Sequence, residues 1–305
     1  MNCPFRFTLM TNDPQLAAQA DRAGVDRIGI DLDRIGKLER QPAGYRISQH
    51  SLADLERLRG VVRPGRLFAR TDPIHAESAR QIDDLLACGV STLMLPMFRE
   101  VEEAARFVEL VAGRAEVVLL VETVAAAFRM GRLARLKGVQ EIMLGLNDLH
   151  LDARLGNRFE IVVSDLMESL ARTVTSCGIR FGFGGVGRCD DETLPVPSSL
   201  IYPQYARLGA SSAIIARSFY RSDDKAFDDQ QFIEALVQAR TSLARWAREP
   251  PEVLDQARQR LERHLELLRV PGKVSGLFSH DLLAAKMTSW EDQDVPTQRA
   301  GFITP

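Results

Sequence analysis

Short apolar runs and amphipathic stretches alternate along most of the chain. Runs such as Arg27–Asp31 and Thr92–Leu95 are short, largely apolar and bounded by polar or turn residues, as is typical of buried strands. Between such runs, apolar residues recur with a helical period, for example in Ser51–Val62. Asp13-Pro14 and Gly24 carry the residue types that commonly begin and end a helix. The pattern therefore predicts an alternation of strands and helices.

The predicted elements form eight consecutive strand-then-helix units. We expect strands at Phe5–Met10, Arg27–Asp31, Arg66–Arg70, Thr92–Leu95, Val117–Val121, Glu141–Gly145, Ile179–Phe183 and Ser212–Ala216. We expect helices at Pro14–Ala23, Ser51–Val62, Ile74–Cys88, Val101–Val111, Ala125–Leu136, Asp165–Ser176, Ser199–Leu208 and Gln230–Trp246. This alternation gives an α/β fold with a parallel sheet, and eight units in about 250 residues match a TIM (β/α)8 barrel. A doubly wound open sheet is the alternative that periodicity alone leaves open.

Pro250-Pro251 is the predicted domain boundary. We assign residues 1–248 to a (β/α)8 barrel catalytic domain and residues 249–305 to a C-terminal helical extension and tail. Within the extension, Glu252–Leu268 is an amphipathic, charge-rich segment that predicts a helix. We interpret the extension as a lid or an oligomer contact.

Composition narrows the functional classes. The chain has 305 residues with 45% hydrophobic and 26% charged residues, and its formal net charge is -2. No basic excess indicates a nucleic-acid partner, and no polybasic run indicates a membrane surface. The apolar runs are too short to span a bilayer, and the N-terminal residues lack the features of a secretory signal. The four cysteines are scattered, so we expect reduced thiols and a cytoplasmic protein.

Two of the apolar runs stop abruptly at an acidic residue. EVVLLVET places Glu122 after the predicted strand at Val117–Val121, and EIMLGLNDL places Asp148 after the next strand. A carboxylate at the end of a buried strand is costly unless it is paired or holds a cation. Acids on consecutive parallel strands face one crevice, and their oxygens suit Mg2+, with Mn2+ as the alternative. The alternative interpretation is that Glu122 and Asp148 cap helices or join Arg70 in a structural ion cluster.

The other predicted strands also carry candidate site residues at their carboxyl ends, where the active sites of barrels lie. Asp31 and Asp33 follow the second strand, and Arg70 ends the third. Gly184 and Gly185 follow the seventh strand and are candidate substrate-binding residues. Together these residues indicate a metal site for an anionic substrate. Asp33 could instead only cap a loop, and the glycines could only permit tight turns.

These residues also carry a resemblance to a known family. The chain resembles the HpcH/HpaI aldolase and citrate lyase beta-subunit family, within the phosphoenolpyruvate/pyruvate superfamily of TIM barrels. The motifs are the acid pair after strand two, Arg70, Gly89-Val90 with Leu95-Pro96, Val121-Glu122-Thr123 and Gly145-Leu146-Asn147-Asp148-Leu149, within residues 15–220. The sequence departs from the family at Thr71 and Met97, so it resembles a divergent member.

The resemblance implies a divalent-metal-dependent carbon–carbon lyase or aldolase that acts through an enolate of a 2-oxo acid or an acyl-CoA. Glu122 and Asp148 match the family's metal ligands. Arg70 matches the arginine that contacts the substrate carboxylate and the enolate oxygen. Asp31 and Asp33 match acids near the metal's waters, and either of them, or a metal-bound water, is the candidate proton carrier. His50 lies too far along the loop to match the histidine that some aldolases use.

Several alternatives stay open at this level. A coenzyme A substrate needs basic groups at the rim of the site, and Arg34, Lys37 and Arg40 offer them. The resemblance also implies a homo-oligomer, a trimer or hexamer, in which Asp281 could complete a neighbouring site from a C-terminal lid. A different functional class is a non-catalytic barrel that binds an anionic metabolite as a sensor or partner subunit.

Overall fold

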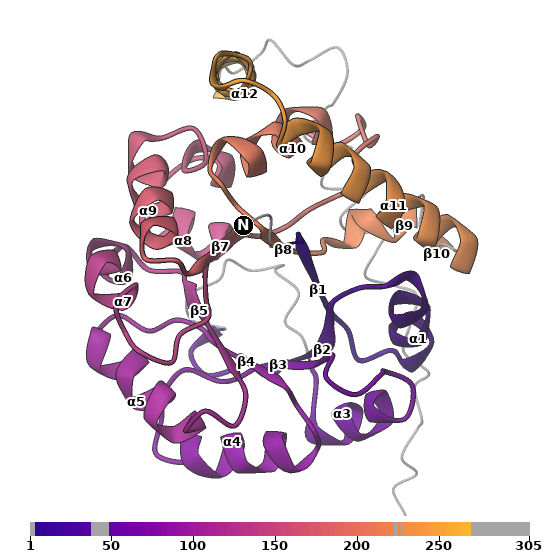
Figure 1. The fold of residues 1–305 in the computed structure, drawn as a ribbon, viewed down its shortest axis with the longest axis vertical. Helices are drawn as coiled ribbons and strands as arrows, with labels where there is room; N and C mark the ends of the chain where they lie inside the picture. Colours follow the sequence, from indigo (N-terminus) through magenta and orange to yellow (C-terminus); the bar gives the residue numbers. More distant parts are fainter. Residues whose placement is uncertain (1–3, 38–48, 223–224, 227, 270–305) are drawn as a thin grey trace, which may run out of the picture. The chain divides into compact units, whose positions relative to one another are not determined.

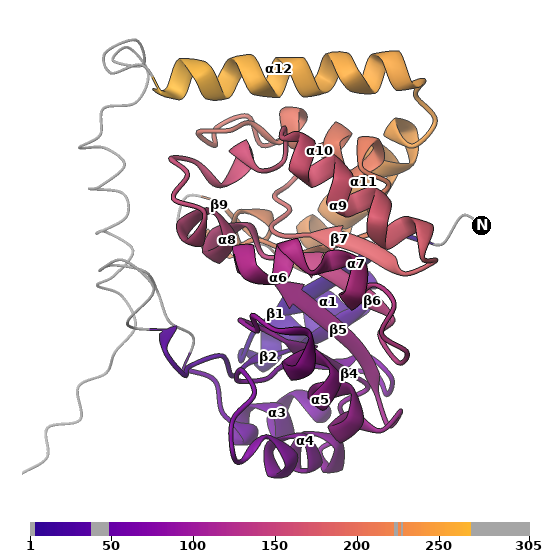
Figure 2. The same ribbon diagram turned by 90° about the vertical axis from the view of Figure 1, so that its left-hand side faces the viewer.

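Eight parallel strands pair in chain order and close on themselves, because β1 pairs with β8 as well as with β2 (Figure 1). The computed structural model describes residues 4–37, 49–222, 225–226 and 228–269. Helices surround the strands in the end-on view of Figure 1, and in Figure 2 the strands run between the helices of this outer layer. The closed order confirms the predicted TIM barrel and excludes the open sheet.

The elements follow one another in the expected alternation. The barrel strands are β1 (Arg6–Met10), β2 (Arg27–Asp31), β3 (Leu67–Arg70), β4 (Thr92–Leu95), β5 (Glu116–Val121), β6 (Glu141–Leu144), β7 (Arg180–Phe183) and β8 (Ser212–Ile214). The α-helices are α1 (Pro14–Ala23), α3 (Leu52–Arg59), α4 (Ser78–Ala87), α5 (Val101–Val111), α6 (Val124–Phe128), α7 (Met130–Leu133), α8 (Leu146–Asp152), α9 (Asp165–Ser176), α10 (Ser198–Arg207), α11 (Asp229–Trp246) and α12 (Pro251–Arg269). Short 3-10 helices η1 (Arg158–Glu160) and η2 (Arg217–Phe219) and a hairpin of β9 (Arg221–Ser222) with β10 (Lys225–Ala226) complete the described elements.

The described residues up to Leu265 belong to one compact unit, and the residues from Glu266 onward are assigned to a second. The first unit includes most of α12, which buries Ala257, Leu261 and Leu265 on one face. The helix expected at Glu252–Leu268 is therefore confirmed. The division of the chain at residues 248 and 249 stays a prediction.

Local signals account for the helix ends that the sequence predicted well. The Asp13 side chain accepts a hydrogen bond from the Gln15 backbone at the start of α1, with Pro14 in the first helical position. Gly24 ends α1 with φ of 92°, a left-handed conformation that glycine adopts without steric cost. Such caps depend on near neighbours in sequence, which is why α1 has the expected limits.

The largest departures from the expected elements lie in the fifth and sixth units. β6 ends at Leu144, Gly145 becomes the N-cap residue of α8, and Asp148 lies in the first turn of that helix. The single helix expected at Ala125–Leu136 is divided into α6 and α7. Both departures involve helices of four to seven residues, which are too short to show a clear helical period in the sequence.

The middle of the barrel is apolar. Inward-facing side chains of neighbouring strands form a buried cluster of Phe68, Met94, Val118, Leu120 and Met143. Met10 and Ile214 pack against this cluster from the strands that close the barrel. The interior is therefore filled with side chains, as in other barrels of eight strands, and is not a channel.

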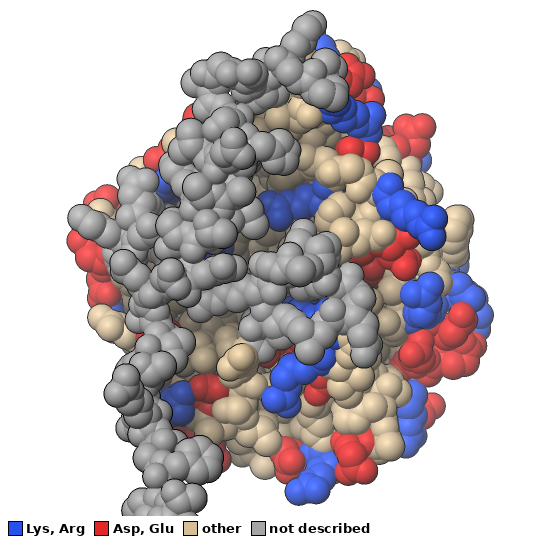
Figure 3. Space-filling model, turned by 180° about the vertical axis from the view of Figure 1, so that it is seen from behind, with Lys and Arg blue, Asp and Glu red and all other residues tan. Residues whose placement is uncertain are grey.

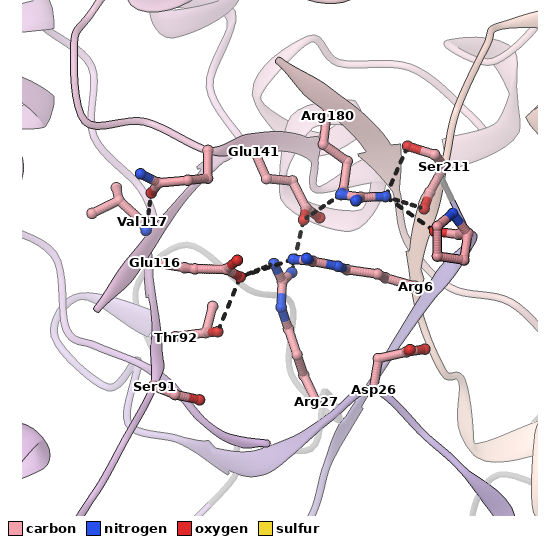
Figure 4. A network of polar contacts seen from close by, with 12 residues as sticks. Arg6, Asp26, Arg27, Ser91, Thr92, Glu116, Val117, Glu141, Arg180 and Ser211 are labelled. Carbon is pink, nitrogen blue, oxygen red and sulfur yellow. Dashed lines mark hydrogen bonds and ion pairs between the residues drawn. The ribbon is translucent and has the colours of Figure 1, made fainter. Parts of the chain in front are cut away.

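A charged network fills the amino-terminal end of the barrel (Figure 4). Five of its charged side chains are the first residues of their strands: Arg6 in β1, Arg27 in β2, Glu116 in β5, Glu141 in β6 and Arg180 in β7. Opposite charges alternate across it, since Glu116 lies 2.8 Å from Arg6 and 2.9 Å from Arg27. The strand starts thus converge on one another by ion pairing.

The centre of this network is buried. Arg27 Nη1 lies 2.8 Å from Glu141 Oε2, and their side chains are 4% and 0% exposed. The Arg180 guanidinium adds a third positive charge, 3.8 Å from the same carboxylate. A buried pair of this kind contributes little net stability when intact, but removing one partner leaves an uncompensated charge in the interior.

The outer surface carries many ion pairs of a different kind. In the view of Figure 3, positive and negative side chains border one another where the described residues are uncovered. Arg132 and Glu102, for example, pair at 2.9 Å although both side chains are more than 60% exposed. Exposed pairs contribute about 0–1 kcal/mol each. Among the residues described, no helix combines the length and apolar character needed to cross a bilayer.

We expect Arg27→Met to lower the free energy of unfolding by about 3–5 kcal/mol, because it leaves the buried Glu141 carboxylate without its main partner. Chemical denaturation at neutral pH measures this difference. Arg132→Met, the same substitution at an exposed pair, is the matched control and should change the value by less than about 1 kcal/mol. Equal effects for the two variants would contradict the structural role of the network.

Candidate functional site

An ion pair joins the carboxyl ends of β2 and β3. Asp31 and Arg70 are direct neighbours in the parallel register of these strands. The guanidinium donates from Nε to Asp31 Oδ1 and from Nη2 to Oδ2, both at 2.7 Å. This bidentate contact uses one edge of the planar guanidinium and fixes its orientation. Two of the predicted site residues are thus brought together, but by each other rather than around a cation.

The loop after β2 brings a lysine to the same carboxylate. Lys37 Nζ lies 3.2 Å from Asp31 Oδ2 and 3.5 Å from Asp33 Oδ2. The backbone N–H of Asp33 also donates to Asp31 Oδ1 at 3.1 Å. All three side chains are buried, with exposures of 6% or less. Lys37 is therefore part of the site's interior and does not lie at a solvated rim.

Asp72 holds this loop in place. Its Oδ1 accepts hydrogen bonds from the backbone N–H groups of Arg34 at 2.9 Å and Ile35 at 3.2 Å. Its Oδ2 accepts a hydrogen bond from Gln81 Nε2 of α4 at 2.7 Å. The residue two positions after Arg70 thus organises the loop that carries Asp33 and Lys37. Its place at a strand end is the only sequence signal that marks it.

Electrostatics keep both members of the Asp31–Arg70 pair charged. Burial alone would raise the pKa of the Asp31 carboxyl, but the charge and hydrogen bonds of Arg70, followed by Lys37, hold that pKa well below its usual range. Burial opposes the charged form of Arg70 as well, but Asp31 and then Glu122 raise its pKa further. Asp31 is consequently a weak base at neutral pH.

Glu122 approaches the Arg70 guanidinium from the end of β5, two strands along the barrel from β3. It follows β5 directly, and its Oε1 lies 3.6 Å from Arg70 Nη1, the nitrogen that does not contact Asp31. The neighbouring Thr123, and not Glu122, caps α6 through its side chain. The helix-cap alternative therefore does not apply to Glu122, whereas the proposed ion cluster with Arg70 is present.

Gly145 shapes the space that Glu122 occupies. A Cβ atom on Gly145 would lie 2.4 Å from Glu122 Cγ and 2.6 Å from its Oε1. The Gly145 N–H donates to the carbonyl of Val121, the last residue of β5, at 3.0 Å. The Glu122 side chain thus lies beside Gly145 at the start of α8. Gly145 is three residues before Asp148 in the chain.

Glu122 and Asp148 are the residues that could hold a metal ion. Both are buried, and they follow adjacent parallel strands, because Val121 and Leu144 are register partners. Among the described residues, no three histidine, cysteine, aspartate or glutamate side chains converge as a metal site. Mg2+ nevertheless often binds through one or two carboxylates, with water and substrate oxygens as the other ligands. The donor set of two buried carboxylates therefore fits such an ion.

The predicted glycines lie at the carboxyl end of β7. Gly184 donates its N–H to the Leu144 carbonyl at 3.3 Å. Cβ atoms on Gly184 and Gly185 would meet Ile214 and Ala216 at 3.6 and 3.3 Å, so the space beside them is bounded by the end of β8. These positions agree with a place near the site, and their role in substrate binding stays a prediction.

His50 is a buried neighbour of the site that sequence spacing did not identify. The backbone N–H of Asp31 donates to His50 Nδ1 at 2.9 Å, which requires the ring to be neutral with its proton on Nε2. Burial lowers the pKa of His50, although the Asp31 and Asp54 carboxylates oppose this effect. The contact spans 19 residues of sequence, so no local pattern could reveal it.

The other residues singled out in the sequence lie at the surface, outside the described residues, or apart from the site. Arg34 is exposed, as a rim residue would be. Arg40 and Asp281 lie outside the described residues. The cysteines Cys88, Cys177 and Cys189 are free thiols, as expected.

The fold resembles those of several solved proteins of low sequence identity. The HpcH/HpaI aldolase from Desulfitobacterium hafniense DCB-2 matches with a TM-score of 0.54 and 16% identity, over 70% of this chain and 86% of the other. The citrate lyase beta subunit from M. tuberculosis, complexed with oxaloacetate and magnesium, matches with 0.54 and 18%, over 81% and 98%. The CitE protein from Mycobacterium tuberculosis, in complex with magnesium, acetoacetate and coenzyme A, matches with 0.55 and 16%, over 96% and 100%.

These matches confirm the predicted resemblance at the level of the fold. No family profile matches the sequence, and no curated protein matches it either. The similarity therefore lies in the backbone arrangement.

We expect Gly145→Ala to destabilise the protein by about 1–3 kcal/mol, because the added methyl group would overlap the Glu122 side chain. Thermal and urea unfolding measure the loss. Gly60→Ala is the matched control, since Gly60 has φ of -73° and a Cβ there would meet nothing nearer than 3.5 Å. A fully stable Gly145→Ala protein with Glu122 unmoved in its crystal structure would contradict this account of the site.

We expect stability to fall with pH below about 6.5, the ordinary pKa of histidine. The folded-state pKa of His50 is lowered, so the unfolded chain binds the proton more readily between the two pKa values. The contribution is therefore complete above about pH 6.5 and decreases as the pH falls towards the folded pKa. Urea unfolding between about pH 5 and 8 should show a weaker pH dependence for His50→Gln than for the wild type, and identical slopes would refute the prediction.

Proposed function

We propose that this protein is a divalent-metal-dependent carbon–carbon lyase that acts through the enolate of a 2-oxo acid or an acyl-CoA. The observation that carries the proposal is the arrangement around Arg70. Its guanidinium is fixed on one edge by Asp31, and its remaining nitrogen lies 3.6 Å from Glu122. A preoriented guanidinium stabilises negative charge as it develops on a nearby substrate oxygen, and buried carboxylates supply the oxygens that a divalent ion needs.

The chain's own residues would divide the work as follows. Glu122 and Asp148 would hold the ion, which when bound would act as a Lewis acid on the substrate carbonyl. Arg70 Nη1 would donate a hydrogen bond to the oxygen that becomes negative as the adjacent carbon–carbon bond breaks. Burial of the site strengthens these interactions, because water cannot screen them. Gly184 and Gly185 would line the substrate space beside β8.

Asp33 is the better candidate for the proton carrier. Asp31 accepts four hydrogen bonds or ion-pair contacts, and its pKa is lowered, so it holds Arg70 rather than accepting a proton. Asp33 is buried two residues further along the same loop and contacts Lys37 at 3.5 Å. Of the two carboxylates expected from the sequence, we therefore propose Asp33, and a metal-bound water is the other candidate.

The solved proteins of similar fold support the proposed class. The M. tuberculosis structures contain magnesium with oxaloacetate, or with acetoacetate and coenzyme A. A small anionic substrate and a magnesium ion are proposed for this chain by analogy with these complexes. The trimer or hexamer expected from the sequence resemblance also stays a prediction.

Retro-aldol assays test the proposal. We expect turnover of a short 4-hydroxy-2-oxo acid, or of malyl- or citramalyl-CoA, that requires Mg2+ and is abolished by a chelator. Glu122→Gln should abolish the metal dependence together with the activity, and Arg70→Ala should lower kcat about a hundredfold or more. Glu102→Gln, at an exposed carboxylate of α5, is the matched control and should keep full activity.

Ligand-dependent melting, measured beside these assays, distinguishes the sensor hypothesis from the lyase proposal. Oxalate or pyruvate with Mg2+ should raise the melting temperature of the wild type under either hypothesis, because any ligand that binds the folded state stabilises it. If ligand-dependent stabilisation occurs while no substrate of either class is turned over, the lyase proposal fails and a binding function is left.

A further inference from the structure

The Asp31 carboxylate makes an unusually complete set of contacts. Oδ1 accepts from Arg70 Nε at 2.7 Å and from the Asp33 backbone N–H at 3.1 Å. Oδ2 accepts from Arg70 Nη2 at 2.7 Å and from Lys37 Nζ at 3.2 Å. Each oxygen therefore has one bond to the guanidinium and one to the loop after β2. A carboxylate held in this way has one orientation, and its bidentate contact fixes the orientation of the Arg70 guanidinium.

Lys37 is the contact that the strand register does not explain. Asp31 and Arg70 are register partners, so their pairing follows from the barrel itself. Lys37 reaches the carboxylate from a loop, six residues beyond Asp31, and its side chain is only 6% exposed. Burying an ammonium group costs free energy unless it is paired, and here it is paired with two carboxylates. Lys37 is therefore a paired interior group and not a solvated surface lysine.

The position of Lys37 between Asp31 and Asp33 separates two negative charges. Its Nζ lies 3.2 Å from one carboxylate and 3.5 Å from the other. Two buried carboxylates that contact the same ammonium group would repel each other without it. Either carboxylate could then compete for Arg70. In this arrangement Asp31 forms the bidentate contact with Arg70, and Arg70 Nη1 lies 3.6 Å from Glu122 Oε1.

We propose that Lys37 is a positioning residue for Arg70, acting through Asp31. It fixes the Asp31 carboxylate so that the guanidinium presents Nη1 to the substrate space beside Glu122. The catalytic consequence rests on the proposed lyase function, whereas the positioning of Arg70 does not. A merely structural role, in which Lys37 only neutralises buried charge, predicts a change in stability without any change at Arg70.

The test compares Lys37→Met with Lys37→Arg and with Lys137→Met. Lys37→Met keeps most of the length of the side chain but removes its charge, and Lys37→Arg keeps the charge. Lys137 is exposed, so Lys137→Met is the matched control for the loss of one positive charge. All variants are studied as the full chain. If Lys37→Met does not fold, Lys37→Gln, which keeps donor groups without the charge, takes its place.

The first measurement follows the Arg70 Nε–H directly by 15N-labelled NMR, with Arg70→Lys assigning its signal. A short, charge-assisted hydrogen bond to Asp31 should give a shifted, slowly exchanging signal in the wild type. We expect this signal to move and to exchange faster in Lys37→Met, and to be largely restored in Lys37→Arg. Lys137→Met should leave it unchanged.

The second measurement separates kcat from KM. Loss of a residue that orients a catalytic group commonly lowers activity about tenfold to a hundredfold. We expect Lys37→Met to lower kcat by such a factor with a smaller change in KM, and Lys37→Arg to recover part of the loss. A Lys37→Met protein with wild-type kcat and an unchanged Arg70 signal would overturn the proposal, even if its melting temperature is lower.

The two proposals fail separately. If neither substrate class is turned over by the wild type, but the Arg70 signal moves in Lys37→Met, the lyase function fails and the positioning role stands. If the wild type is active and the Arg70 signal does not respond to Lys37, the lyase function stands and Lys37 is structural.

Discussion

The Asp31–Arg70 ion pair joins the carboxyl ends of two neighbouring strands, and the geometry of the candidate site follows from it. The pair is set by the parallel register of β2 and β3, which places the two residues side by side. Because the contact is bidentate, it determines the plane of the guanidinium as well as its position. Lys37 contacts the Asp31 carboxylate of this pair, and Glu122 lies beside the Arg70 guanidinium.

The two ends of the barrel use charge in different ways. At the amino-terminal end, charged first residues of five strands pair with one another around the buried Arg27–Glu141 contact (Figure 4). At the carboxyl end, charged residues surround a guanidinium of which one nitrogen does not take part in the main pair. The apolar cluster around Phe68 and Met143 separates the two layers. In the first arrangement the charges are satisfied by one another, whereas the second is the arrangement that we propose for an anionic substrate.

The fold narrows the chemistry without deciding it. Barrels of this kind place their strand ends around one mouth, so that residues distant in sequence can act together. The solved proteins of similar fold share no more than 18% identity with this chain among those compared above. The proposed chemistry therefore depends on Arg70, Glu122 and Asp148 as they lie in this structure. The substrate class depends on the space beside them, which the retro-aldol assays address.

The sequence by itself determined the repeating units and several of their limits. The strand at Arg27–Asp31 and the helix at Val101–Val111 were predicted with the limits that they have. Their signals are local, because strand and helix periods and helix caps depend on residues a few positions apart. The same reasoning placed Arg70, Asp31 and Glu122 at strand ends, and therefore at one end of the barrel.

Only the tertiary structure decided how those side chains pair. Closure of the barrel depends on the contact of β1 with β8, which no local pattern contains. Lys37 was expected at a solvated rim and is buried, and His50 was set aside although it contacts the Asp31 backbone. Gly145 follows β6 at a place where a Cβ would overlap the Glu122 side chain. These contacts join residues far apart in sequence, so they exist only once the strands are assembled.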